Sequence, residues 1–242
     1  MSTQLLIQFN QNIKKMTTLH ISWWNLENLF DVENSPNRSD KLQRTLKNEL
    51  KGWNQSVLDK KLDNLAAIIN KLNDNYGPDL LGVCEVENRE VVELLKSKLN
   101  RKNYDIVHFD SKDGRGIDVA FIYDTEILSH GEIFSHFIMK RTATRDILQV
   151  NFSIKQNNKT LVAIGNHWTS RSGGELESEP YRMIAGETLS YFHERICEKL
   201  GDDVGIIAMG DFNDTPYNKS LMNYALSTNS GCTDIFPTNV TF

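Results

Sequence analysis

Apolar residues recur along the chain with two different periods. Between residues 58 and 72 a leucine or isoleucine occurs at every third or fourth position, charged side chains occupy the rest of the wheel, and a Gly-Pro pair follows. This spacing predicts an amphipathic helix. In residues 117–123 and 148–154 large apolar side chains occupy every second position, which predicts strands. Further helices are expected at residues 91–99 and 181–200.

Four shorter runs are continuously apolar and predict buried strands at residues 19–24, 80–83, 161–165 and 204–209. Helices interleaved with both kinds of strand favour two packed sheets with helices on their outer faces. Loop residues at the ends of strands can converge on one site. The polar residues that follow these runs are Asn25, Glu85, His167 and Asp211, and we expect them to form a catalytic centre.

The composition allows one domain with a substantial core, because 39% of the residues are hydrophobic and 24% are charged. We expect residues 1–18 to be a flexible extension and residues 19–242 to form the domain. The formal net charge of -5 argues against a protein that holds nucleic acid through a broadly basic face, although a local basic patch stays open.

Cys84, Cys197 and Cys232 are widely spaced, without a CxxC pair, and are expected to be reduced, buried thiols. The first residues contain no continuous apolar leader, and no run approaches the ~20 apolar residues of a membrane span. These features predict a cytoplasmic protein without a membrane span. Nothing in the sequence indicates an obligate protein partner.

Glu85 follows an apolar strand and is a candidate metal ligand, because Mg²⁺ prefers one or two hard protein oxygens and completes its shell with water and phosphate. The alternative is an exposed acid at a strand end. Asp211 and Asn213 lie in a polar turn. Asp211 could orient or deprotonate a water while Asn213 holds a phosphate oxygen. The alternative for this segment is an Asx-turn with Thr215 capping a helix.

His167 could donate a hydrogen bond to a phosphoryl oxygen as charge develops, with Ser170 and Arg171 binding the phosphate. A structural histidine is the alternative. Arg145 belongs to a basic run over residues 140–145 that could touch substrate phosphates or form a solvated turn. Asp118 lies inside a predicted strand and is either a substrate-binding residue or half of a structural pair.

Five short motifs occur in order along the chain: WNLEN at residues 24–28, GVCEVE at 82–87, GIDVA at 116–120, GNHW at 165–168 and GDFN at 210–213. Taken together, they resemble the endonuclease/exonuclease/phosphatase superfamily in its bacterial form. The resemblance implies a four-layered α/β/β/α sandwich of two mainly antiparallel mixed sheets, as in DNase I. It also implies hydrolysis of a phosphoester by water with Mg²⁺ or Mn²⁺ as cofactor.

Carried over by position, Asn25 and Glu85 resemble the metal-site pair and His167 resembles the residue that stabilises the pentacovalent phosphate. Asp211 and Asn213 resemble the pair that positions the nucleophile. The substrate would be a phosphoester within a nucleic acid, a nucleotide or a phosphorylated headgroup, and the resemblance does not separate these classes.

One departure concerns the C-terminal segment. The resemblance implies a last strand with an Asp-His pair, yet no histidine follows His193 here, and Asp234 alone does not replace the pair. We therefore expect the sandwich to lack its last strand or strands. Two alternatives follow: an enzyme whose reading frame continues beyond Phe242, or a degenerate member that binds metal, phosphate ligands or a protein without turnover.

Overall fold

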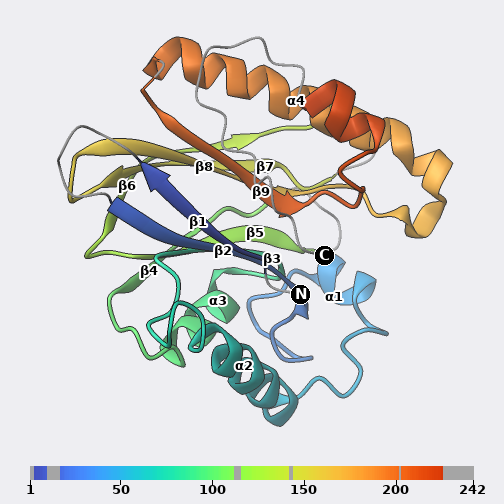
Figure 1. The fold of residues 1–242 in the computed structure, drawn as a ribbon. Coiled ribbons are helices and arrows are strands. Elements are labelled where there is room, and N and C mark those ends of the chain that lie inside the picture. Colours follow the sequence, from blue (N-terminus) through green and yellow to red (C-terminus); the bar gives the residue numbers. More distant parts are fainter. Residues whose placement is uncertain (1–2, 10–16, 112–115, 142–143, 202, 226–242) are drawn as a thin grey trace.

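Two β-sheets lie face to face at the centre of the molecule (Figure 1). The computed structural model describes residues 3–9, 17–111, 116–141, 144–201 and 203–225. The first sheet has the strand order β1-β2-β3-β5-β4. Only its β2–β3 pair is parallel. These strands are β1 (Thr3–Phe9), β2 (Thr17–Leu29), β3 (Leu80–Val86), β4 (Tyr104–His108) and β5 (Asp118–Asp124).

The second sheet has the order β6-β7-β8-β9, and its β8–β9 pair is parallel. A parallel pair places the carboxyl ends of two strands side by side. Each sheet therefore brings one pair of strand ends together. The strands are β6 (Leu128–His136), β7 (Ile147–Ile154), β8 (Lys159–His167) and β9 (Gly205–Asp211).

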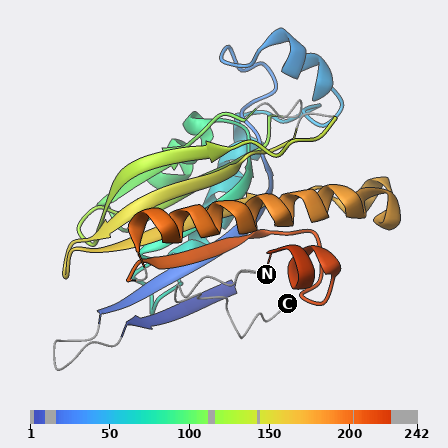
Figure 2. The same ribbon diagram turned by 90° about the horizontal axis from the view of Figure 1, so that it is seen from above.

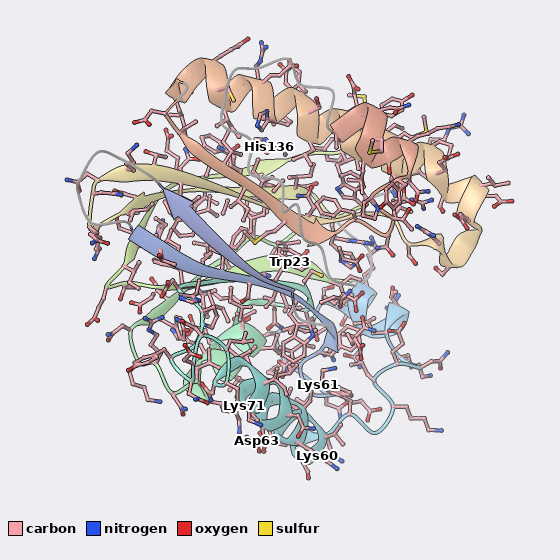
Figure 3. The ribbon with its side chains drawn as sticks, in the orientation of Figure 1. Trp23, Lys60, Lys61, Asp63, Lys71 and His136 are labelled. Atoms are coloured by element: carbon pink, nitrogen blue, oxygen red, sulfur yellow. The ribbon has the colours of Figure 1, made fainter. Side chains whose placement is uncertain are left out.

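Helices cover the outer faces of both sheets, which completes four layers (Figures 1 and 2). The first sheet carries α2 and α3, the second carries α4, and α1 lies at one end. Lys60, Asp63 and Lys71 point away from the sheet, as the helical spacing predicts (Figure 3). The helices are α1 (Asp40–Thr45), α2 (Gln55–Ile69), α3 (Arg89–Ser97) and α4 (Glu175–Leu200), with short turns η1 (Arg171–Gly173) and η2 (Ser220–Ala225).

Three apolar layers hold the sandwich together. Between the sheets, Phe121 and Phe152 meet edge to face with ring centroids 6.3 Å apart, and Trp23 packs edge-on against Phe121 (Figure 3). Full burial of one such ring stabilises the fold by about 1.5–3 kcal/mol. On β5, Ala120 and Ile122 face the α2–α3 layer instead. This alternation confirms the period-two pattern read from the sequence.

The structure confirms the expected four-layered sandwich of two mixed sheets. Thr3–Phe9 pairs with residues Thr17–Trp23 of β2. The division of the chain at residue 19 into an extension and a domain stays a prediction. Residues 31–54 include α1 and the buried Leu46 and Leu50. The segment after residue 225, with Asp234, lies outside the described residues.

Helix α4 begins at Glu175, six residues earlier than expected, because Pro180 is accommodated inside it. Proline lacks the N–H of an internal helix residue and normally marks a boundary. In the turns on either side of it, Ser178 Oγ donates to Gly174 O, and Arg182 Nη2 donates to Glu175 O.

One cysteine departs from the sequence prediction. Cys84 is a buried free thiol, as expected, but Cys197 is disulfide-bonded. Disulfides are rare in the cytosol of most organisms. The cytoplasmic location therefore stays a prediction, with this bond against it. Within the described part of the chain, no helix combines the length and the apolar character that crossing a membrane requires.

Candidate active site

Four polar side chains meet where the ends of β2, β3, β8 and β9 come together. Asn25 Nδ2 donates to Glu85 Oε1 at 3.1 Å and to Asp211 Oδ2 at 3.0 Å. His167 Nε2 lies 3.5 Å from Glu85 Oε1. Asn25 and Glu85 come from the first sheet, whereas His167 and Asp211 come from the second. The predicted convergence of the four strand-end residues is therefore present in the structure.

Left-handed backbone directs Glu85 into this site. Glu85 has a φ of 62° and interrupts the pairing of β3 with β5. Opposite it, Glu27 and Asn28 have φ values of 54° and 62° where β2 loses register, and the Asn28 N–H donates to Glu85 Oε2 at 3.0 Å. Such conformations cost about 1–3 kcal/mol each in residues other than glycine and concentrate at functional sites. Bulges of this kind re-aim side chains.

The turn after β9 holds Asp211 and Asn213 in a fixed relation. The Asn213 N–H donates to Asp211 Oδ1 at 3.0 Å, and Asn213 has a φ of 52°. Asn213 Nδ2 donates to Trp168 O at 3.1 Å. The Asx-turn expected as an alternative is thus present. This turn engages Oδ1 of Asp211, whereas Oδ2 accepts the hydrogen bond from Asn25.

A close approach of β8 and β9 sets the position of His167 beside Asp211. Gly210 pairs with Asn166, and a Cβ at Gly210 would lie 2.3 Å from Asn166 O, so only glycine fits there. The fully buried Asn166 donates from Nδ2 to Met209 O and accepts the Trp168 indole N–H. Asn166 and Gly210 therefore lock the two strand ends together.

A buried charge network supports the loop that carries Asn213. Arg182 Nε lies 2.8 Å from Asp214 Oδ2, and both side chains are 0% exposed. Arg171 Nη2 lies 3.1 Å from Asp214 Oδ1, and Arg171 Nε donates to Asn213 O at 2.8 Å. The network joins α4, the η1 loop and the turn after β9. Asp214 and Arg182 were not predicted from sequence, because Arg182 resembles an ordinary surface residue of a charged helix.

The remaining predicted substrate-binding residues lie in different surroundings. Arg145 is buried, not part of a solvated turn, and its guanidinium donates to His167 O and Trp168 O. Ser170 caps η1 by accepting the Ser172 N–H. Asp118 lies apart from the four converging side chains, beside His108. Direct substrate contact by Arg145, Ser170, Arg171 and Asp118 stays a prediction.

The carboxylates of Glu85 and Asp211 give the site a negative potential, which affects the pKa of the neighbouring Cys84 thiol. Burial raises the pKa of Cys84 well above 9.0, the negative charges of Asp211 and Glu85 raise it further, and Arg145 opposes them. At the mouth of the site, burial lowers the pKa of Lys61, opposed by the charges of Glu27 and Glu85. Lys61 Nζ donates to Glu27 O at 2.8 Å (Figure 3).

The raised pKa of Cys84 makes stability depend on alkaline pH. Below pH 9 both the folded and the unfolded thiol are protonated, so the stabilisation is fully present. Above it the unfolded chain releases a proton that the folded chain retains, and the free energy of unfolding falls by up to ~1.4 kcal/mol per pH unit. Urea titrations between pH 8 and 10 should therefore show a steeper loss for the native sequence than for Cys84→Ala. Equal slopes would contradict this.

The donor set fits a hard divalent cation. Glu85 and Asp211 bring two carboxylates within reach of one Asn25 amide, and Mg²⁺ prefers oxygen ligands of this kind. In this arrangement Asn25 presents its nitrogen to the carboxylates while Oδ1 accepts the Glu27 N–H, so Asn25 orients Glu85. A half-turn of the amide would present the oxygen instead. The residues present therefore fit the metal that the family resemblance implies.

Comparisons with known proteins agree with this fold. A structure of an endonuclease/exonuclease/phosphatase family protein from Bacteroides thetaiotaomicron is 14% identical, covers 94% of this chain and 68% of its own, and has a TM-score of 0.58. The human Nocturnin catalytic domain with bound sulfate is 15% identical, with coverages of 93% and 72% and a TM-score of 0.53. The Bacteroides thetaiotaomicron mannosyl-6-phosphatase is 16% identical, with coverages of 84% and 69% and a TM-score of 0.54.

These identities are low, so the structural likeness shows the fold alone. A comparison with curated protein sequences gave no match. The family model of the Endonuclease/Exonuclease/phosphatase family matches residues 20–234. This match spans most of the chain and includes every residue of the candidate site. The chain belongs to the endonuclease/exonuclease/phosphatase family.

Proposed function

We propose that the protein hydrolyses a phosphoester with the help of a divalent cation, Mg²⁺ or Mn²⁺. The observation that carries this proposal is the meeting of Asn25, Glu85, His167 and Asp211 at four strand ends drawn from two sheets. The names of the structural neighbours, among them a mannosyl-6-phosphatase and a catalytic domain with bound sulfate, agree with phosphoryl chemistry.

Each residue of the site has a task that its contacts permit. Glu85, oriented by Asn25, would hold the cation, which when bound neutralises phosphate charge and lowers the pKa of water. Asp211 is fixed by Asn25 and by the Asn213 N–H, so its carboxylate can orient a water and accept a proton. His167, buried beside Glu85, would donate a hydrogen bond to the phosphoryl oxygen as negative charge develops.

Three basic or hydroxyl side chains would contribute to substrate binding. Arg171 is partly exposed beside Asn213, which suits an outer phosphate contact, and Ser170 lies next to it. Arg145 would contribute indirectly, because its guanidinium donates a hydrogen bond to the backbone carbonyl of His167. The acidic balance of the chain disfavours long duplex nucleic acid, because such binding rests on many Lys and Arg contacts to phosphate. A nucleotide, a short single strand or a phosphorylated headgroup fits better.

Replacing Glu85 with Gln tests the proposal. The amide keeps an acceptor for the Asn28 N–H but removes the charge that the cation requires, so hydrolysis of bis-p-nitrophenyl phosphate in Mg²⁺ should fall by at least ~100-fold. Circular dichroism should be unchanged. Glu90→Gln, an exposed carboxylate in the first turn of α3, is the matched control and should retain full activity. Equal Mg²⁺-dependent rates for the two variants would reject the assignment.

A further inference from the structure

Three metal-ligating side chains gather on the face of the first sheet that the candidate active site does not use. His108 ends β4, Asp118 begins β5, and Asp110 lies on the loop between them. One ligand atom from each lies within 4.8 Å of the other two. Ile106 and Ala120, two positions away on the same strands, pack in the α2–α3 layer. Because side chains alternate along a strand, His108 and Asp118 share that outer face.

The His108 imidazole is buried and lacks a hydrogen bond where it faces Asp118. Its side chain is 3% exposed, and Nε2 has no hydrogen-bond partner among the described residues. The nearest carboxylate oxygen, Asp118 Oδ2, lies 3.7 Å away. A charge-assisted hydrogen bond between these groups would close to about 2.7–2.9 Å. The distance is therefore too long for a direct bond, and a buried polar atom without a partner is destabilising.

The backbone fixes the carboxylate of Asp118 in this orientation. Asp118 Oδ1 accepts the Ser111 N–H at 3.0 Å, which leaves Oδ2 directed at the imidazole. Asp110 is on the open side, with its side chain 85% exposed, and its Oδ1 lies 3.8 Å from His108 Nδ1. Asp110 Oδ1 therefore approaches the other ring nitrogen from the one that faces Asp118. One ligand atom of each residue nevertheless lies within 4.8 Å of the other two, and the exposed side chain of Asp110 can turn toward the space between His108 Nε2 and Asp118 Oδ2.

We propose that His108, Asp110 and Asp118 bind a divalent transition-metal ion, with Zn²⁺ as the best match. Bonds from zinc to imidazole nitrogen and to carboxylate oxygen are about 2.0–2.2 Å long, so their sum exceeds the observed 3.7 Å and an ion fits between the two atoms in a bent arrangement. An imidazole ligand favours zinc, copper, iron or nickel over Mg²⁺, which prefers oxygen. The two carboxylates balance the charge of the ion, and water completes its shell.

Such an ion would act on structure and not on the reacting phosphate. It would join the end of β4 to the start of β5 and close the loop between them. Asp118 pairs with Val86, the residue after Glu85, so the ion would brace the β3 bulge from its outer face. This site is distinct from the oxygen-rich site of Glu85 both in its ligands and in the face of the sheet on which it lies.

Zinc titration of metal-stripped protein tests the proposal. In a Glu85→Gln background, which removes the charge of Glu85 from the other candidate metal site, calorimetry should find one Zn²⁺ bound per chain, and saturating Zn²⁺ should raise the thermal midpoint by about 5–10 °C. Adding His108→Gln should weaken binding by at least ~100-fold and abolish the thermal shift. Adding Asp110→Asn, an exposed substitution that does not threaten folding, should weaken binding at least ~10-fold.

His130→Gln is the matched control, because His130 is an exposed histidine on β6 outside the cluster, and it should bind Zn²⁺ as the parent does. If the folded His108→Gln and Asp110→Asn variants kept the affinity and thermal shift of the parent, the site would be rejected. Hydrolysis plays no part in this readout, so loss of the proposed activity and loss of the zinc site are separate outcomes.

Discussion

Replacing Asp211 with Asn is expected to lower kcat and kcat/KM together by at least ~100-fold, the loss typical of an interaction made only in the transition state. The reason lies in its contacts. Asp211 Oδ2 accepts a hydrogen bond from Asn25 Nδ2, and Oδ1 accepts the Asn213 N–H. An Asn side chain can retain the second contact but must turn an amino group toward Asn25. The Asn side chain cannot accept a proton from water, and its amino group cannot accept the hydrogen bond from Asn25 Nδ2.

Steady-state kinetics with a soluble phosphodiester measure this effect, with His167→Ala as a companion variant expected to behave alike. Asp203→Asn is the matched control, because Asp203 is an exposed aspartate just before β9. Among the described residues, its ion pair is with Lys159. An unchanged kcat with a raised KM in the Asp211 and His167 variants would assign both residues to substrate binding and would overturn their proposed roles.

Arg182→Met should destabilise the fold by about 3–5 kcal/mol, because it removes the buried partner of a buried carboxylate and leaves only the partly exposed Arg171 beside it. Asp214 and Arg182 are both 0% exposed and 2.8 Å apart, and Arg182 Nη1 also donates to Ser178 Oγ at 2.6 Å. The midpoint of urea unfolding should fall accordingly. The same variant should reduce activity under folding conditions, since Asp214 is the residue after Asn213.

Two further variants make this prediction specific. Arg195→Met, on the same helix but half-exposed in an ion pair with Glu198, should change stability by no more than about 1 kcal/mol. Replacing Arg182 and Asp214 together with apolar residues should recover much of the stability lost in Arg182→Met, because no lone charge stays buried. A single variant as stable as the native chain would show that the pair contributes nothing.

The sequence allowed prediction of those parts of the fold whose burial is periodic. The strands that end near Glu85, His167 and Asp211 are largely buried on both faces, so they read as continuous apolar runs. By contrast β6 exposes most of its residues at the edge of its sheet, which leaves no alternation to detect. The edge strand β4 has only five residues.

The sequence allowed prediction of the side chains that form the candidate site, but not of the backbone bulge and the buried charge pairs around it. Polar residues after apolar runs indicated which side chains converge. The bulge at Glu85 was not predictable, because a left-handed glutamate has no local sequence signal. Nor was the buried pair of Arg38 with Glu87, whose atoms approach to 2.6 Å across 49 residues. Long-range charge pairs of this kind depend on tertiary packing, which spacing along the chain does not encode.

The origin of the site in two sheets has a consequence for synthesis of the chain. Asn25 is separated by 60 residues from Glu85 and by 186 from Asp211, yet its amide touches both carboxylates. A nascent chain can complete the first sheet while Asp211 is still inside the ribosome. At that stage it holds Glu85 without Asp211 or the turn that follows β9. The proposed hydrolytic centre would thus come into being only when the second sheet docks, and a half-made protein would be harmless to the phosphoesters around it.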